Sequence, residues 1–597
     1  MVGRSHRRVN NSTSTTSFVG RGTTDRALSR VVPLALIATA VLLGCFAGLD
    51  SAGLFDLDEG IYGTAARQMV ESGDWITPRV GREPVFDKPP LAYWLQAVCM
   101  RFIGFTPAAA RLPSALAAVA TGLLLWWLAA RRIRLTLAWM APVTYVLCPL
   151  TLALARQATM DSILALWMLL AVIGWAEGYA RDRRMYLLSA AAIGLAIMTK
   201  GIIGFLPGVA FVVWLALRRD LRALRGVPWL ACCALLVAMV APWHIAMWRV
   251  HGPVFIREYI IHHHIQRFLG EDFRHNAPVW YYGPVLVLAT FPWIAYMVRP
   301  WAQGLRASAG RGTPHDRLTT VWAVWPAVVI GFFSISRSKL PGYILPALPP
   351  LALLAACRMD EAWQDRRGLN ALEAALLALS GAALAAFFGV ASWLGHTWRT
   401  SSHPLVFGRP APDLAVEIAT SIWIPAGLVA ALCLVGAGAV LMRSGCVAWQ
   451  VAATVGVSLA FTSVVVGIGL PAWARSEVAP LHDIARLTLP ALDRGKPVLI
   501  YRVDRRRPSL HFVLGHPDLV QETFSAATAR RVLVRAGGGY LLAESGTPVP
   551  LTPLSAHLVA SADDWSLWRY DPAAAAPRRP AVATRSPWRA EEARRLN

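Results

Sequence analysis

Long apolar stretches separated by short polar segments dominate the first 470 residues of the chain. A helix needs about 20 mainly apolar residues to cross a bilayer, and about thirteen stretches approach that length. In chain order, these candidate spans are 31–53, 110–130, 135–154, 162–180, 185–199, 202–217, 228–249, 279–298, 319–335, 344–357, 370–394, 421–442 and 447–470. The pattern therefore predicts an α-helical polytopic membrane protein with about thirteen transmembrane helices.

The pattern changes after the last candidate span. Residues 497–501 and 539–543 read as buried strands, and 524–535 reads as a short amphipathic helix. These elements predict a small α/β domain over 471–571, outside the membrane. Residues 572–597 are rich in Pro, Arg and Ala, a composition typical of a disordered tail.

Positive charge gathers in the connections between alternate spans. If the basic amino-terminal tail (1–30) is cytoplasmic, every strongly basic short connection of the membrane portion (31–470) falls on the same side. These connections hold Arg131, Arg132 and Arg134; Arg181, Arg183 and Arg184; Arg218, Arg219, Arg222 and Arg225; Arg299, Arg306, Arg311 and Arg317; and Arg358, Arg366 and Arg367. This is the positive-inside rule of a multi-pass inner-membrane protein. It explains the net charge of +23 without a nucleic-acid partner.

The opposite connections carry acidic groups at the edge of the membrane. The long first outer loop (54–109) begins with Asp56, Asp58 and Glu59, and Asp161 stands at another outer boundary. Ionisable groups at membrane depth are costly and are candidates for function. The alternative for the loop acids is that they cap the next helix and solvate the loop.

Cations also occur on this side, where the orientation rule would leave few. They are Lys88, Lys200, Arg267, Arg337 and Lys339. Around a pocket at the lipid boundary they would stabilise a phosphate through charge-assisted hydrogen bonds. The alternative is an interfacial rim that binds lipid headgroups. The run His262–His264 offers metal-ligand chemistry, although adjacent histidines seldom all bind one ion.

Several motifs in this arrangement resemble the ArnT-type aminoarabinose transferases, within the membrane glycosyltransferase class that includes protein O-mannosyltransferases. In the first outer loop and just after it, they are Asp58–Tyr62, Met69–Trp75, Asp87–Trp94 and Ala110–Ser114. Further along, in the same order as in the family, are Arg156–Asp161, Met198–Gly201, His264–Phe268, Trp280–Tyr282, Phe291–Trp293 and Ser338–Pro346.

The resemblance implies a GT-C-type fold, a polyprenyl-phosphate sugar donor and inversion at the anomeric carbon. It implies a catalytic role for Asp58 and a place in the site for the second acid, Asp161, and we add the neighbouring Glu59 as a catalytic candidate. It implies that Lys88 meets the carrier phosphate and that Lys339 and Tyr343 belong to the segment that closes over the donor. We predict that Arg267, Tyr62 and Lys200 complete the phosphate site. It also implies a divalent metal, zinc, held by His264 and Asp87, and we add the adjacent His263 as a third predicted ligand.

These inferences predict an inverting glycosyltransferase that acts, as a monomer, on the periplasmic face of the inner membrane. Its donor would be an undecaprenyl-phosphate-linked sugar, 4-amino-4-deoxy-L-arabinose or a related sugar, and its acceptor lipid A or another envelope molecule. A protein O-mannosyltransferase-like enzyme is the first alternative. A transporter is the second, although its functional charges would lie near the bilayer midplane and not at the outer boundary.

Overall fold

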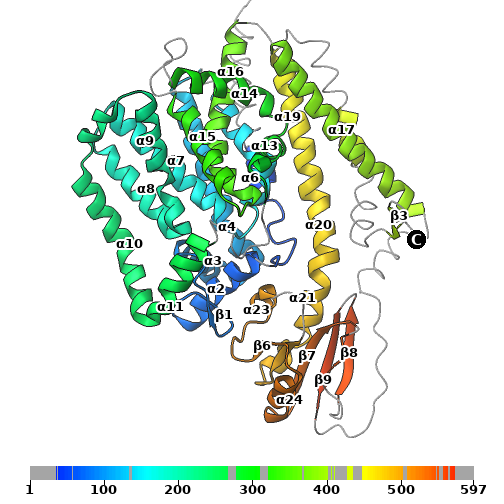
Figure 1. The fold of residues 1–597 in the computed structure, drawn as a ribbon. Helices are drawn as coiled ribbons and strands as arrows, with labels where there is room; N and C mark the ends of the chain where they lie inside the picture. Colours follow the sequence, from blue (N-terminus) through cyan, green and yellow to red (C-terminus); the bar gives the residue numbers. More distant parts are fainter. Residues whose placement is uncertain are drawn as a thin grey trace, which may run out of the picture.

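The computed structural model has a helical membrane domain with a small α/β domain attached at one end (Figure 1). The structure describes residues 35, 38–56, 58–133, 137–266, 277–308, 320–365, 369–400, 405–406, 409–410, 426–429, 431–433, 447–501, 507–545, 547–549, 556–562 and 565–571. The predicted tails 1–30 and 572–597 lie outside these residues.

The membrane domain is a bundle of helices, several of them broken into consecutive segments. In chain order, they are η1 (Leu42–Phe46), α4 (Pro107–Ala130), α5 (Met140–Val146), α6 (Pro149–Ala155), α7 (Asp161–Ala180), α8 (Met185–Lys200), η2 (Gly201–Phe205), α9 (Leu206–Leu217), η3 (Leu221–Gly226), α10 (Trp229–His251), α11 (Pro253–Phe255), η4 (Ile256–Gln266), η5 (Val279–Tyr281), α13 (Tyr282–Ala289), α14 (Ile294–Ser308), α15 (Val321–Ile335), η6 (Pro341–Ala347), α16 (Leu348–Asp365), α17 (Ala371–Thr400) and α19 (Val447–Val464). A short hairpin, β3 (Leu405–Val406) and β4 (Arg409–Pro410), follows α17.

Among the described residues, seven helices are long and apolar enough to cross a membrane, which confirms a multi-pass membrane protein. They are Pro107–Ala130, Asp161–Ala180, Met185–Leu217, Trp229–His251, Pro341–Asp365, Ala371–Thr397 and Trp449–Trp473. Shorter apolar helices at Val279–Ala289 and Val321–Ile335 fall in two further predicted spans. The predicted spans 185–199 and 202–217 fall together in the single span Met185–Leu217. The total of about thirteen stays a prediction, because the candidates 31–53, 135–154 and 421–442 lie partly outside the described residues.

Small residues let neighbouring helices pack closely in the bundle. A side chain on Gly174 of α7 would place its Cβ 2.7 Å from the backbone nitrogen of Ser189 on α8. Because lipid is as apolar as the protein interior, such close van der Waals packing drives the association of membrane helices. On the outside, α10 exposes large apolar side chains, among them Leu230 and Val237, as expected of a surface that faces lipid.

The first outer loop folds into an interfacial layer at the end of the bundle near the α/β domain (Figure 1). It comprises α2 (Asp58–Ser72), the two-stranded ribbon β1 (Arg79–Val80) and β2 (Glu83–Pro84), and α3 (Leu91–Ile103). Buried alanines and the tyrosines Tyr62 and Tyr93 join α2 and α3 to α4 and α7. The loop is therefore part of the folded bundle.

The α/β domain contains a mixed five-stranded sheet with the strand order β6-β5-β7-β9-β8. Its elements are α21 (Ala479–Arg486), α22 (Leu489–Leu492), β5 (Val498–Tyr501), α23 (Pro508–Leu514), β6 (Val520–Thr523), α24 (Ala526–Arg535), β7 (Gly539–Glu544), β8 (Ala556–Ala562) and β9 (Trp565–Tyr570). Strand β5 pairs in parallel with β6 and β7, and β9 is antiparallel to β7 and β8. The two predicted strands and the predicted amphipathic helix correspond to β5, β7 and α24.

One helical path connects the two domains. It runs from α19 through η7 (Val465–Gly469), α20 (Leu470–Trp473) and η8 (Ala474–Val478) into α21. Figure 1 shows this path extending from the membrane bundle down to the sheet. The predicted boundary at residue 471 lies inside it.

Candidate active site

Asp58, the first residue of α2, lies among charges from three other segments. The pKa of its carboxyl is raised above the usual value, first by burial and then by the negative charges of Asp87 and Asp161. The ammonium groups of Lys88 and Lys200 act in the opposite direction. The structure thus brings five predicted site residues into one electrostatic cluster, at the end of the bundle nearest the α/β domain.

A salt bridge between two membrane helices forms one side of this cluster. Lys200 ends α8 and Asp161 begins α7, and the Nζ–Oδ1 distance is 2.5 Å. Each charge suits its position, because a helix dipole favours an acid at the amino end and a cation at the carboxyl end. The ring centroid of Tyr343, in η6, lies 4.8 Å from Lys200 Nζ. The neighbouring Gly342 is so close that a Cβ on it would lie 3.5 Å from the carboxyl carbon of Asp161.

A second lysine–carboxylate pair comes from the loop before α3. Lys88 Nζ donates a hydrogen bond to Oδ1 of Asp87, and a second one of 3.1 Å to the carbonyl oxygen of the same residue. The Nδ1 atom of His263, in η4, lies 3.2 Å from Asp87 Oδ1. Two of the three predicted metal ligands therefore meet, whereas the side chain of His264 lies outside the described part of the chain.

Two buried tyrosines form an apolar wall beside the acids. The rings of Tyr62 and Tyr93 pack edge to face with centroids 5.7 Å apart. Burial and the neighbouring carboxylates raise the pKa of both hydroxyls well above the usual value, so both remain neutral hydrogen-bond donors. The Tyr93 hydroxyl has no hydrogen-bond partner among the described residues. Tyr93 was not among the predicted site residues, although it lies within the Asp87–Trp94 motif.

Glu59, predicted as catalytic, is fully engaged in a buried ion pair. Its carboxylate receives the Nε and Nη2 groups of Arg111 at 2.9 and 2.8 Å, and both side chains are 3% exposed. The backbone nitrogens of Phe55 and Ala158 donate to the same carboxylate at 3.0 and 2.6 Å. With both oxygens occupied, Glu59 is suited to joining α2, α4 and the turn before α7.

Lys339, another predicted phosphate-binding cation, is bonded to the backbone in this structure. Lys339 is 4% exposed, and its Nζ donates to the carbonyl oxygens of Ala277 and Ser336. In this arrangement it fixes the backbone around the start of η6. Arg267 lies outside the described residues.

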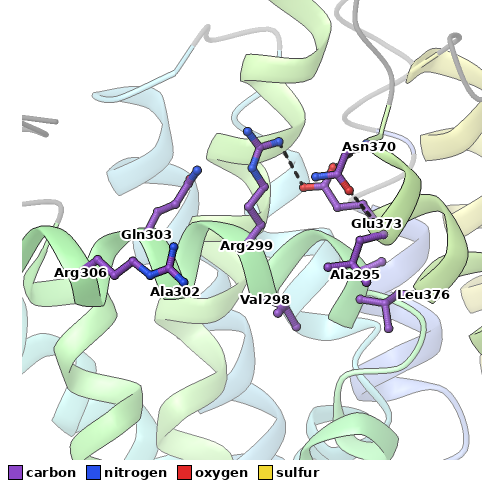
Figure 2. Close-up of a pocket in the computed structure, with 10 residues that line it drawn as sticks. Ala295, Val298, Arg299, Ala302, Gln303, Arg306, Asn370, Glu373 and Leu376 are labelled. Atoms are coloured by element: carbon purple, nitrogen blue, oxygen red, sulfur yellow. Dashed lines mark hydrogen bonds and ion pairs between the residues drawn. The ribbon is translucent and has the colours of Figure 1, made fainter. Parts of the chain in front are cut away.

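A cavity of about 320 Å³ lies apart from this cluster, between α14 and α17. Figure 2 shows Arg299, Gln303 and Arg306 along α14, with Glu373 of α17 opposite. Arg299 lies 3.7 Å from Glu373, which also forms a bidentate ion pair with Arg358. The cavity contains none of the predicted site residues.

Comparisons with known proteins agree with this arrangement. Residues 87–248 match the family model described as dolichyl-phosphate-mannose-protein mannosyltransferase. The chain is 33% identical over 333 residues to an undecaprenyl phosphate-alpha-4-amino-4-deoxy-L-arabinose arabinosyl transferase of Sodalis glossinidius, covering 54% of this chain and 58% of that protein. It is 29% identical over 458 residues to the transferase of that name from Edwardsiella ictaluri, covering 75% and 78% of the two chains. The chain spans less than two thirds of the length of several curated relatives that it matches, including the Sodalis glossinidius protein.

The fold also matches a solved structure. It superimposes on ArnT from Cupriavidus metallidurans bound to undecaprenyl phosphate with a TM-score of 0.73 and 24% sequence identity, covering 93% of this chain and all of that one. The resemblance to ArnT-type GT-C proteins, first seen in the motifs, is confirmed by sequence and by fold.

Proposed function

We propose that this chain, an ArnT-type GT-C protein by sequence and fold, transfers a sugar from a polyprenyl-phosphate carrier to an acceptor at the periplasmic face of the bacterial inner membrane. The observation that carries the proposal is the meeting of Asp58, Asp161, Lys88 and Lys200 from four separate segments. Two cations and an acid of raised pKa are the groups that such a transfer needs.

The reaction is a displacement at the anomeric carbon of the sugar. The bond from this carbon to the carrier phosphate oxygen breaks, and a bond to the acceptor oxygen forms on the opposite face. Lys88 and Lys200 would exchange their carboxylate partners in part for the phosphate and stabilise the charge that develops as it leaves. One such preorganised group typically lowers the barrier by about 2.7–4 kcal/mol. Tyr343, beside Lys200, would cover the phosphate.

Asp58 is the proposed general base. Its raised pKa brings the carboxylate nearer to the operating pH, where proton transfer is more effective. It would take the proton of an acceptor hydroxyl. If the acceptor is an anionic phosphate, no proton has to move, and the carboxylate would instead stabilise positive charge on the sugar ring.

The composition of the cluster favours an amino sugar. Three carboxylates, of Asp58, Asp87 and Asp161, surround two ammonium groups. Once the carrier phosphate pairs with the two ammonium groups, a protonated amine on the sugar would pair with a carboxylate that they release. We therefore assign 4-amino-4-deoxy-L-arabinose as the sugar, in line with the names of the curated relatives. Lipid A is the proposed acceptor.

A zinc ion remains part of the proposal, with Asp87 and His263 as ligands. Their oxygen and nitrogen atoms converge and are donor types that zinc accepts. No group of three acidic, histidine or cysteine residues with metal-site geometry occurs in the described part of the chain. A bound ion would supply positive charge near the carrier phosphate. Metal analysis of the purified protein, compared with Asp87→Ala and His263→Ala variants, tests this assignment.

The decisive experiment is transfer by the purified protein in lipid nanodiscs. Wild type, Asp58→Asn and Asp161→Asn would each receive an undecaprenyl-phosphate sugar donor and lipid A, and mass spectrometry would follow the product. We expect the wild type to add the mass of the amino sugar to lipid A, and Asp58→Asn to lose the transfer. Transfer to a polypeptide would favour the O-mannosyltransferase alternative, and sugar-lipid movement without a new covalent bond would favour a transporter. Full activity of Asp58→Asn would refute the assigned base.

A further inference from the structure

We propose that the C-terminal α/β domain holds the amino end of α2, and with it Asp58, through a buried polar clasp made of Asp56, Ser509, Arg507 and His482. The inference rests on the proposed function. It assigns residues that position the catalytic Asp58 to the α/β domain, in which no site residue was predicted. Asp56 lies two residues before Asp58, and the other three belong to the α/β domain.

The centre of the clasp is a two-point contact between Asp56 and the start of α23. The backbone nitrogen of Ser509 donates to Asp56 Oδ1 at 2.8 Å, and its hydroxyl donates to Oδ2 at 2.9 Å. The first turn of a helix has unpaired N–H groups, which an acidic side chain commonly caps from just upstream. Here the cap comes from a residue 453 positions away in the sequence. Arg507, 3.7 Å from Asp56, adds an opposite charge.

Burial makes this contact costly to break. Ser509 is 1% exposed, and His482 on α21, which is 2% exposed, lies with Nε2 3.1 Å from the Ser509 hydroxyl. Burial lowers the pKa of His482 to about 4, so its imidazole is neutral above that pH. Burial also disfavours the charged form of Asp56 and raises the pKa of its carboxyl. The hydrogen bonds from Ser509 and the charge of Arg507 act in the opposite direction and lower this pKa, but burial has the larger effect.

The clasp is not a hydrolytic triad. In a Ser–His–Asp triad the acid orients the histidine, and the serine faces a substrate. Here the acid binds the serine, and the serine is enclosed between the two domains. The geometry therefore points to positioning.

The remaining contacts of α2 divide its surface into two faces. Toward α23, a Cβ on Gly60 would lie 2.6 Å from the Ser509 nitrogen, and one on Gly63 would lie 3.4 Å from the Phe512 ring. Thr64 donates to the carbonyl of Pro508 at 2.8 Å, and Arg67 donates to that of Phe512.

Asp58 and Tyr62 occupy the other face of the helix. At about 3.6 residues per turn, these two positions lie opposite Gly60, Gly63, Thr64 and Arg67. Helix α2 is thus held between the α/β domain and the acid–lysine cluster, so a shift of α23 would move Asp58. A misplacement of about 1 Å can lower a rate by ~10²-fold.

The test uses the full-length protein with Asp56→Ala, Asp56→Asn and Ser509→Ala. The matched control is Arg82→Ala. Arg82 also joins the first loop to the α/β domain, through Asp518 at 3.2 Å, but these two side chains are 65% and 81% exposed and do not touch α2. We expect Asp56→Ala and Ser509→Ala to lower kcat about 10- to 100-fold with KM for the donor changed less than about twofold. Asp56→Asn, which keeps an acceptor for the Ser509 N–H, should recover part of the rate, and Arg82→Ala should match wild type.

Hydrogen exchange supplies a readout that does not depend on transfer. Amides of residues 58–64 should exchange faster in Asp56→Ala and Ser509→Ala than in wild type or Arg82→Ala. If the wild-type protein showed no transferase activity, but α2 still exchanged faster in the clasp variants than in wild type, the result would support the clasp and count against the proposed function. Unchanged exchange and unchanged kcat in both folded clasp variants would overturn the clasp and leave the proposed function intact. If Arg82→Ala lowered kcat as much as the clasp variants do, the loss would not be specific to the clasp, and the clasp would also be overturned.

Discussion

The Arg111–Glu59 pair allows the sharpest energetic prediction. Arg111 donates to both oxygens of Glu59 and also to the carbonyls of Leu49, Ala52 and Gly53, at 2.8 Å each. Replacing Arg111 with Met removes the partner of a carboxylate that is 3% exposed. Breaking a buried ion pair by removing one partner costs about 3–5 kcal/mol, because the remaining charge is uncompensated. We expect Arg111→Met to destabilise the protein by about that amount.

The double variant Glu59→Met/Arg111→Met separates charge from packing. It removes the buried charge but leaves three carbonyls and two backbone N–H groups without their side-chain partners. The double variant should therefore remain less stable than wild type. Its loss of stability should be smaller than the sum of the losses in the two single variants, and this difference, the coupling energy, should be about 0.5–3 kcal/mol. Equilibrium unfolding in mixed micelles, followed by intrinsic fluorescence, measures all four proteins. Additive losses, or a wild-type midpoint for Arg111→Met, would show that the pair does not hold the first loop as described.

Three further predictions address the site and the bundle. Lys200→Met should lower kcat/KM for the donor by about 10²–10³-fold in the nanodisc transfer assay, because it removes a cation from the departing phosphate; a loss below threefold would exclude that role. In protein freed of divalent metal by a chelator, Asp87→Asn should shift the acidic limb of the pH–rate profile to lower pH, because removing this negative charge lowers the pKa of Asp58 and keeps the base ionised in more acidic solution. A shift to higher pH would contradict the assignment. Glu373→Ala should destabilise the protein by about 3–5 kcal/mol in thermal unfolding, since it strands the buried Arg358, with the exposed Arg569→Ala as a control expected to change little.

Local patterns in the sequence predicted what depends on local physics. The length of apolar stretches identified the long spans, and short apolar runs identified the buried strands β5 and β7. Charge at span boundaries identified Asp161 and Lys200, which the structure joins at 2.5 Å. Charge in the outer loops also identified Asp58 and Lys88, and the motif resemblance added Tyr343.

Contacts between segments that are distant in the sequence could not be predicted from those patterns. Hydropathy and spacing do not tell whether an acid in the first loop is free or saturated, so Glu59 could not be distinguished from Asp58. The reading of the loop acids as helix caps fits Asp56, but the helix it caps is α23 in another domain. Likewise, Lys339 carries the charge of a phosphate ligand, but its partners in the structure are backbone carbonyls, which no side-chain motif records.

The helical path from α19 to α21 sets a mechanical constraint on the molecule. An α-helix advances about 1.5 Å and turns about 100° with each residue, and the π-helical segments η7 and η8 also add a rise and a rotation per residue. The length of the path therefore fixes both the height and the orientation of the sheet that it carries. Adding or deleting one residue between Val464 and Ala479 would rotate the sheet about the helix axis and carry Ser509 away from Asp56. A chimaera that takes residues 465–478 from a relative would therefore have to keep the number of residues in this segment, even if the sequence differs.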